Sequence, residues 1–244
     1  MVSEPYTERA IAEHALSMYE IEPSVVEFLQ HSGTITYRIK DIHGSYFLLR
    51  VYLPISTFFT THWTCPDHVR SEMMWLSYLN EEGSVSVQEP LKTKENELIC
   101  LLDIKSRKQV PGTLLRWIEG ENKERLDKEQ VEQIAMLLAR LHQLWAEWSV
   151  PPGFARPCYD TKYLREALAE AEKHVGHKVI AAPEFRLFEE SVEIICSLMN
   201  ELGESADYWG LIHGDFFHPN IVFRNSKASP IDFSECGDSR CLLV

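Results

Sequence analysis

The segment that decides the fold lies near the end of the chain and reads Leu211-Ile-His-Gly-Asp-Phe-Phe-His-Pro-Asn-Ile-Val-Phe-Arg224, followed by Pro230-Ile-Asp-Phe233. The apolar run from Ile221 to Phe223 is typical of a strand, and residues 225–227 are typical of a turn. Residues from Ser229 to Phe233 are expected to return as a second strand. The sequence therefore predicts a short hairpin with a polar loop in front of it.

Three polar side chains stand where these strands stop: Asp215, Asn220 five residues later, and Asp232 twelve residues beyond that. Two carboxylates and a carboxamide that meet at one end of a hairpin supply hard oxygen ligands, which suit magnesium and phosphate oxygens. The same spacing occurs in phosphoryl-transfer loops, where an Asp faces the acceptor hydroxyl and an Asn and a second Asp bind the metal. The alternative is an ordinary polar hairpin with an Asp at each end.

His213-Gly-Asp215 and Ile231-Asp-Phe233 together make the chain resemble the aminoglycoside phosphotransferase family, a choline-kinase-like family with the protein-kinase-like fold. The resemblance covers essentially the whole chain. Residues 70–76, 88–90 and 115–120 look most like the branch with homoserine kinase type II-like and stress-response kinase-like proteins. The resemblance implies a kinase that uses ATP and Mg²⁺ and transfers the γ-phosphate to a hydroxyl of a small molecule, or of a protein serine or threonine.

The resemblance also assigns roles to residues of the hairpin. It implies that Asn220 and Asp232 hold the metal, while Asp215 orients the acceptor and takes its proton late in the reaction. His213 is the second catalytic candidate, although we expect it to brace the loop rather than to act as a base. His218 inside the loop either contacts phosphate or packs.

The first half of the chain is rich in strand patterns. Residues Ser24–Gln30, Ile35–Ile39 and Tyr46–Tyr52 are joined by polar, glycine-bearing turns and predict an antiparallel meander. By the resemblance, Gly33 and Thr34 in the first turn lie where such kinases cover the nucleotide phosphates. The alternative for these two residues is a plain hairpin turn.

The third strand contains a cation in an otherwise apolar setting. Arg50 shares a face with Leu48 and Tyr52, so it needs a partner if the strand is buried. A helix opened by Pro66, with Asp67 as its expected N-cap, puts Glu72 on an apolar stripe. By the resemblance, Arg50 contacts the phosphates and Glu72 orients it, as a Lys and a Glu do in protein kinases. The alternative is a surface arginine and a half-exposed glutamate.

The remaining pattern predicts an α+β, two-lobed protein-kinase-like fold. Residues 85–90, 98–103 and 113–118 are expected to complete the sheet of a small β-rich N-lobe over residues 1–119. A polar connector at 120–125 opens a mainly helical C-lobe over residues 120–244, with helices from 126 and over 163–174 and 184–202. By the resemblance, Trp117 and Ile118 stand in the segment between the lobes that contacts adenine.

The ending departs from the family pattern. Only twelve residues follow Asp232, whereas family members continue with a helical segment that builds much of the acceptor pocket. We therefore expect a truncated C-lobe. The alternative to a kinase is a nucleotide-binding or interaction module that lacks turnover because the acceptor pocket is incomplete.

Composition limits the remaining possibilities. The 244 residues carry a formal net charge of −13, which argues against a nucleic-acid partner and suits either a cationic substrate or simple solubility. No membrane-spanning apolar run or leader is expected, so a cytoplasmic location without membrane contact is predicted. The six cysteines form no Cys-x-x-Cys pair and are expected to be reduced thiols. The sequence predicts no oligomeric state.

Overall fold

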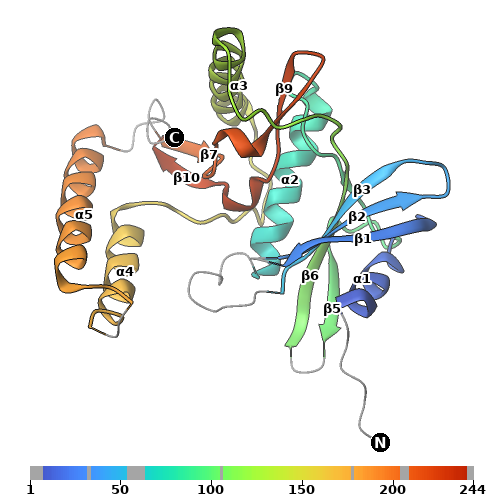
Figure 1. Cartoon of the computed structure of the whole chain (residues 1–244), viewed down its shortest axis with the longest axis horizontal. Coiled ribbons are helices and arrows are strands. Elements are labelled where there is room, and N and C mark those ends of the chain that lie inside the picture. Colours follow the sequence, from blue (N-terminus) through green and yellow to red (C-terminus); the bar gives the residue numbers. More distant parts are fainter. Residues whose placement is uncertain are drawn as a thin grey trace, which may run out of the picture.

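The computed structural model describes residues 8–31, 34–53, 64–104, 107–176, 179–203 and 209–240. An antiparallel sheet with two flanking helices forms one half, and helices with two small strand pairs form the other (Figure 1). The predicted α+β architecture with two lobes is therefore present. The division of the chain at residues 119 and 120 stays a prediction. Gly33 of the predicted phosphate turn lies outside the described residues.

The six-stranded sheet begins with the predicted meander, and all of its pairings are antiparallel. The strand order is β1-β2-β3-β6-β4, and β5 pairs with β6. The strands are β1 (Pro23–His31), β2 (Ile35–Asp41), β3 (Tyr46–Val51), β4 (Pro90–Leu91), β5 (Cys100–Ile104) and β6 (Arg107–Arg116). The expected strand over residues 85–90 is wrong, because only Pro90 and Leu91 pair with β6.

The alternation of side chains along β3 separates a core face from a cavity face. Phe47, Leu49 and Val51 are buried in a cluster with α1 (Glu8–Leu16). Leu48 and Arg50 lie on the opposite face and line a cavity. Helix α1 therefore covers the side of the sheet away from the cavity.

Helix α2 (Pro66–Glu82) carries the predicted inward stripe, with Val69, Glu72, Met73 and Leu76 all buried. The expected N-cap is wrong. Cys65 occupies the cap position without a side-chain hydrogen bond, while Asp67 lies in the first helical turn and pairs with Arg70 at 3.0 Å. Pro66 explains the shift, because a proline fits the first position of a helix and moves Asp67 one step inside.

A single apolar cluster connects α2 to the second half of the chain, and so fixes one half against the other. It joins buried residues of α2 and β6 to Leu141 and Leu144 of α3 (Lys128–Glu147) and to Leu211 and Phe233 near the hairpin. Aromatic rings strengthen this contact: Trp75 of α2 lies 5.9 Å from Trp145 and 5.1 Å from Trp148, centroid to centroid.

The helical half follows the sequence prediction closely. Helix α3 (Lys128–Glu147) begins at Asp127, which forms a capping box with Gln130. Helix α4 (Thr161–Glu172) begins at Asp160, whose carboxylate accepts from the backbone of Tyr163. Helix α5 (Ala182–Leu202) pairs with α4 at the edge of the molecule (Figure 1). In the part of the chain that is described, no helix combines the length and apolarity needed to cross a membrane.

The decisive hairpin has the predicted first strand but a shorter second one. Strand β8 (Ile221–Arg224) pairs with β9 (Lys227–Pro230) across Asn225 and Ser226. The expected extension to Phe233 is wrong, because Asp232 takes a left-handed conformation and residues Phe233–Glu235 form a 3₁₀ turn. Strand β7 (Trp209–Ile212) pairs instead with β10 (Gly237–Arg240), and this second strand pair brackets the loop that contains Asp215.

Candidate active site

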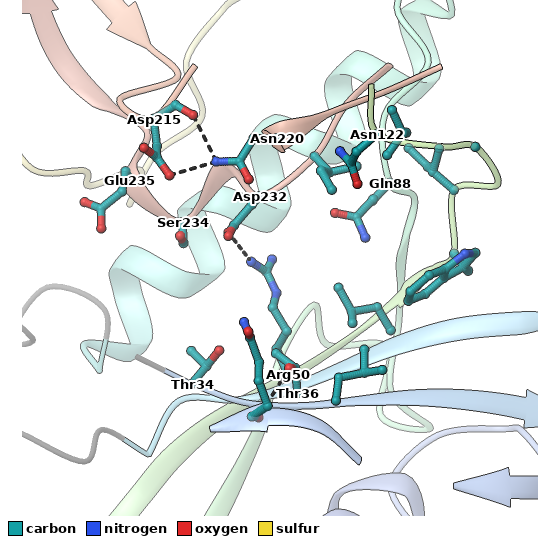
Figure 2. Close-up of a pocket in the computed structure, with 18 residues that line it drawn as sticks. Thr34, Thr36, Arg50, Gln88, Asn122, Asp215, Asn220, Asp232, Ser234 and Glu235 are labelled. Atoms are coloured by element: carbon teal, nitrogen blue, oxygen red, sulfur yellow. Dashed lines mark hydrogen bonds and ion pairs between the residues drawn. The ribbon is translucent and has the colours of Figure 1, made fainter. Parts of the chain in front are cut away.

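A cavity of about 600 Å³ lies between the sheet and the hairpin (Figure 2). Its lining is mixed. The apolar lining residues are Leu29, Leu48, Trp117, Ile118, Val222 and Ile231. Figure 2 shows Asp215, Asn220, Asp232, Ser234 and Glu235 together on one side, here called the polar end, with Gln88 and Asn122 on the other side. We call that other side the apolar end, because Trp117 and Ile118 lie close to Asn122 in the chain. A flat apolar group and a highly charged group on one ligand fit such a cavity.

Most of the residues predicted from sequence meet here. The lining includes Thr34, Arg50, Trp117, Ile118, Asp215, Asn220 and Asp232. Of the candidates that the structure describes, two are not among the lining residues: Glu72, which lies behind Arg50, and His213, which lies behind the loop. Residues from opposite ends of the chain thus converge on one space.

Arg50 is the centre of a buried charge network. Its side chain is 4% exposed, and its Nη2 donates to Glu72 Oε1 at 2.5 Å, with Glu72 1% exposed. The predicted pairing is therefore confirmed, and the alternative of a surface arginine is wrong. Across the cavity, Nη1 of Arg50 lies 3.4 Å from Oδ1 of Asp232 (Figure 2). Burial disfavours the cation, but Glu72 and Asp232 outweigh burial and raise the pKa of Arg50.

One donor of this arginine is left over. Nε of Arg50 is buried and has no hydrogen-bond partner among the described residues. A buried N–H without an acceptor is destabilising, so this atom adds to the cost of burying the guanidinium.

Asn220 holds Asp215 in place. Its Nδ2 donates to the Asp215 carboxylate at 2.7 Å and to the Asp215 backbone carbonyl at 3.0 Å. This arrangement leaves Oδ1 of Asn220 as an oxygen ligand. Burial raises the pKa of Asp215; the hydrogen bond from Asn220 acts in the opposite direction, and the charges of Asp232 and Glu235 add to the increase.

The backbone of this region has two special positions. Gly214 has φ +79°, and a Cβ there would collide with the backbone carbonyl of Glu235, so only glycine permits this approach. Asp232 has φ +63° without being a glycine, a conformation that costs roughly 1–3 kcal/mol unless its surroundings hold it. Strained backbone of this kind is concentrated at functional sites.

His213 is a buried, neutral ring. Since a carbonyl can only accept, Nε2 carries the proton and donates to Ile231 at 3.1 Å, and Nδ1 has no partner in the described part of the chain. The ring lies 4.4 Å from Phe233 and 5.4 Å from Phe216, centroid to centroid. Burial lowers its pKa to about 4. This position agrees with the expected brace rather than with contact to a substrate.

The oxygen ligands of the polar end suit a hard cation. No group of three or more His, Cys, Asp or Glu side chains gathers for a metal within the described ranges. The donors available are the Asn220 carboxamide and the Asp232 carboxylate, whose side chain is 49% exposed. Magnesium commonly takes one or two protein oxygens and completes its shell with water and phosphate, so this pair fits such an ion.

The connecting segment, residues 117–125, contains the predicted polar connector and is fixed against the hairpin by hydrogen bonds. Glu121 and Phe223 exchange backbone hydrogen bonds at 3.0 Å. Asn122 Nδ2 donates to the carbonyls of Pro219 at 2.7 Å and Ile221 at 3.1 Å. Gly120 allows this approach, because a Cβ there would meet the Phe223 carbonyl oxygen at 3.0 Å. The apolar end of the cavity is therefore held by both halves of the chain.

Arg156 is a further residue that sequence reasoning missed. Its guanidinium donates to the carbonyls of Ser234 at 2.6 Å, Cys236 at 2.5 Å and His68 at 2.8 Å. It thereby ties the segment after Asp232 to the start of α2. No local signal marks it, because its partners lie about eighty residues away in both directions. Ser234 and Glu235 also line the cavity, and a sequence signal for them exists, because they directly follow the Ile231-Asp-Phe233 motif.

Comparison with known proteins identifies the family. Residues 33–239 match the phosphotransferase enzyme family, APH. The chain belongs to this family. The family resemblance and the protein-kinase-like fold expected from the sequence are thus confirmed, whereas the finer branch within the family stays a prediction.

Relatives of known name agree with this assignment. Amicoumacin kinase of Bacillus subtilis (strain 168) is 24% identical over 246 residues, which is 95% of this chain and 64% of the relative. The structure of amicoumacin kinase hAmiN in complex with AMP-PNP, Ca²⁺ and Ami has a TM-score of 0.78 at 19% identity, covering 97% of this chain and 66% of the other. The microcompartment-associated aminopropanol kinase has a TM-score of 0.74 at 21% identity, covering 96% and 71%. The chain therefore spans slightly less than two thirds of its amicoumacin kinase relatives, and these structures show a shared fold.

Proposed function

We propose that the chain is an ATP-dependent phosphotransferase that transfers the γ-phosphate to a hydroxyl of a small molecule. One observation carries the proposal: Arg50 of β3, paired with Glu72 of α2, also meets Asp232 of the hairpin across the cavity, at 3.4 Å. The proposal agrees with the kinases among the similar proteins. A cytoplasmic location, where ATP is available, is part of it.

In this proposal the nucleotide lies with its base at the apolar end and its phosphates at the polar end. Trp117 and Ile118 border the base, and Thr34 lies in the turn over the phosphates. The guanidinium of Arg50, which lines the cavity, donates to a phosphate oxygen, while Glu72 holds it in position.

Asn220 and Asp232 would hold the divalent ion, which we propose to be Mg²⁺. When bound, the ion neutralises negative charge on the phosphate oxygens. The similar amicoumacin kinase structure contains Ca²⁺ with AMP-PNP, which supports a divalent ion beside a nucleotide.

Asp215 orients the acceptor hydroxyl and receives its proton. The acceptor oxygen forms a bond to the γ-phosphorus, the bond from that phosphorus to the ADP oxygen breaks, and the proton passes to Asp215 late in the step. Its raised pKa makes the carboxylate a better proton acceptor than an ordinary Asp. His213 braces the loop from behind, through Ile231.

The acceptor is proposed to be a small molecule with a positive charge, such as an amino alcohol. Glu235 lines the cavity together with Asp215, and the chain carries a formal net charge of −13. The similarity to an aminopropanol kinase is consistent with this class. A protein serine or threonine is the second acceptor class to be tested.

A nucleotide-binding or interaction module without turnover is the second candidate. Apolar side chains of α5, such as Leu187 at 62% and Ile194 at 61% exposure, favour it, because exposed apolar surface often marks an interaction site.

Phosphate transfer from γ-labelled ATP to a panel of acceptors decides between the two candidates. The panel consists of aminopropanol, homoserine, choline, aminoglycosides, sugars and a protein serine substrate. The proposal predicts transfer to at least one small hydroxyl compound, and loss of transfer in Asp215→Asn with nucleotide binding retained. Nucleotide binding without transfer across the whole panel would support the module instead.

A further inference from the structure

Gln88 is a buried polar residue at the back of the cavity. It is 6% exposed, and it precedes the short strand β4. Its backbone is fixed on two sides: the Gln88 carbonyl accepts from Asn80 at 3.3 Å, and the next carbonyl, of Glu89, accepts from Arg116 N–H at 2.8 Å. Gln88 therefore sits beside the end of β6, directly before Trp117 of the connecting segment.

The side-chain amide of Gln88 lines the cavity and has no partner. Among the described residues, none forms a hydrogen bond with it. Figure 2 shows Gln88 and Asn122 together on the side of the cavity away from Asp215. Because the amide faces the cavity without a partner in the protein, its oxygen and nitrogen are both free to hydrogen-bond a ligand there.

The proposed function indicates which part of a ligand reaches this depth, and the inference rests on it. The phosphates belong at the polar end near Arg50 and Asp232, and the base at the apolar end near Trp117. A purine is attached to its ribose at N9, so the edge farthest from the ribose carries N1 and the 6-substituent. Gln88 lies on the side of the cavity away from Asp215 (Figure 2), so this edge of the base, the one farthest from the phosphates, is the part that faces it.

We infer that the side-chain amide of Gln88 hydrogen-bonds the 6-substituent of the purine and determines the specificity for the base. An amide offers one accepting oxygen and one donating nitrogen, and rotation about its last bond exchanges them. Oε1 accepts from a 6-amino group, and Nε2 donates to a 6-oxo group. The unaltered chain therefore binds both kinds of purine nucleotide.

Three nucleotides and three chains test this assignment by calorimetry in the presence of Mg²⁺. The nucleotides are ATP, inosine triphosphate and purine riboside triphosphate, which have an amino group, an oxo group and a hydrogen at position 6. The chains are the unaltered one, Gln88→Met and Gln88→Glu. Gln88→Met has neither donor nor acceptor, whereas the carboxylate of Gln88→Glu only accepts.

We expect the unaltered chain to bind ATP and inosine triphosphate within about threefold of each other. Gln88→Met should lower the affinity for both nucleotides by about tenfold, the equivalent of one good hydrogen bond. Its affinity for purine riboside triphosphate should stay within about twofold of that of the unaltered chain. Gln88→Glu should keep its affinity for ATP and lose more than tenfold in affinity for inosine triphosphate, because the carboxylate and the 6-oxo group are both hydrogen-bond acceptors.

Controls separate this effect from damage to the fold. Gln143→Met, on the exposed surface of α3, should leave all three affinities unchanged. Thermal unfolding of each nucleotide-free variant checks that it is folded. Equal ratios among the three nucleotides in all three chains would overturn the inference and leave the proposed function standing. Binding that follows these ratios without any phosphate transfer would refute the proposed function alone. No nucleotide binding by the unaltered chain would overturn both.

Discussion

Removing either member of the Arg50–Glu72 pair should strongly destabilise the protein. Glu72→Leu leaves a buried cation that keeps only the half-exposed Asp232, at 3.4 Å. Arg50→Met leaves a buried carboxylate whose remaining side-chain hydrogen bond, among the described residues, comes from the neutral Tyr52 Oη at 3.4 Å, while the charge of Arg156 acts on it without a direct ion pair. An unpaired buried charge costs about 3–5 kcal/mol. We place Glu72→Leu near the lower end of that range and Arg50→Met near the upper end, because Arg50 retains the better partner.

The double variant Arg50→Met with Glu72→Leu separates stability from function. Apolar residues of similar volume leave no buried charge, so we expect the double variant to unfold within about 1–2 kcal/mol of the unaltered chain. Nucleotide binding should stay lost, because the donor to the phosphates is absent. A double-mutant cycle on urea unfolding, combined with calorimetry of ATP binding with Mg²⁺, measures both quantities.

The exposed pair Arg165 and Glu193 is a matched control, with a closest distance of 2.7 Å and side chains 54% and 63% exposed. Arg165→Met with Glu193→Leu should change neither stability nor ATP binding measurably, since exposed pairs contribute little. Additive losses for Arg50→Met and Glu72→Leu would refute the reasoning, because they would mean that the two charges do not depend on each other. A double variant that still binds ATP like the unaltered chain would refute the phosphate role.

Three further predictions concern pH and positioning. Burial lowers the pKa of His213 from 6.5 to about 4 in the folded chain. The neutral ring therefore contributes its full share to the free energy of unfolding above pH 6.5, and this share, about 3 kcal/mol, is lost as the pH falls to 4. The free energy of unfolding, measured with urea at pH 7 and pH 4.5, should fall less between these two values in His213→Phe than in the unaltered chain. An equal fall in both chains would count against a neutral buried ring. The pKa of Asp215 is raised chiefly by burial and further by neighbouring carboxylates including Glu235, so Glu235→Gln should move the acidic limb of the kcat/KM profile to lower pH, and a limb that stays in place would contradict the coupling. Arg156 holds the segment after Asp232 by its hydrogen bonds to the carbonyls of Ser234 and Cys236, so Arg156→Met should reduce the gain in ATP affinity on adding Mg²⁺ by about tenfold. Arg156→Lys should restore part of this gain. An equal gain in all three chains would limit Arg156 to a structural role.

Features that depend on local pattern were predictable from the sequence. The alternation along β3 put Arg50 on one face, and the helical spacing of α2 put Glu72 on the buried stripe. In a small lobe two buried charges of opposite sign have few other partners, so the ion pair of Arg50 and Glu72 could be predicted. The oxygen ligands of the hairpin were predictable for the same reason, because strand ends place Asp215 and Asn220 close to Asp232.

Features that depend on distant backbone were not predictable. The sequence predicts Gln88 to be part of a strand, and no neighbouring residue indicates that it lies beside the end of β6, nearly thirty residues later in the chain. Arg156 lies in a loop, and its three carbonyl acceptors belong to other elements. The left-handed turn at Asp232 was not predictable, because an Asp within an apolar run is also compatible with a strand, whereas β9 ends at Pro230.

The most direct test of the account is a comparison of Asp215→Asn and Asp232→Asn in calorimetry of ATP binding, with and without Mg²⁺. The two carboxylates line one cavity, but only Asp232 contacts Arg50, and only Asp215 is held by Asn220. The account predicts that Asp215→Asn binds ATP with Mg²⁺ within about threefold of the unaltered chain, whereas Asp232→Asn loses most of the Mg²⁺-dependent affinity. Equal losses in the two variants would contradict the division of the cavity into an acceptor side and a metal and nucleotide side.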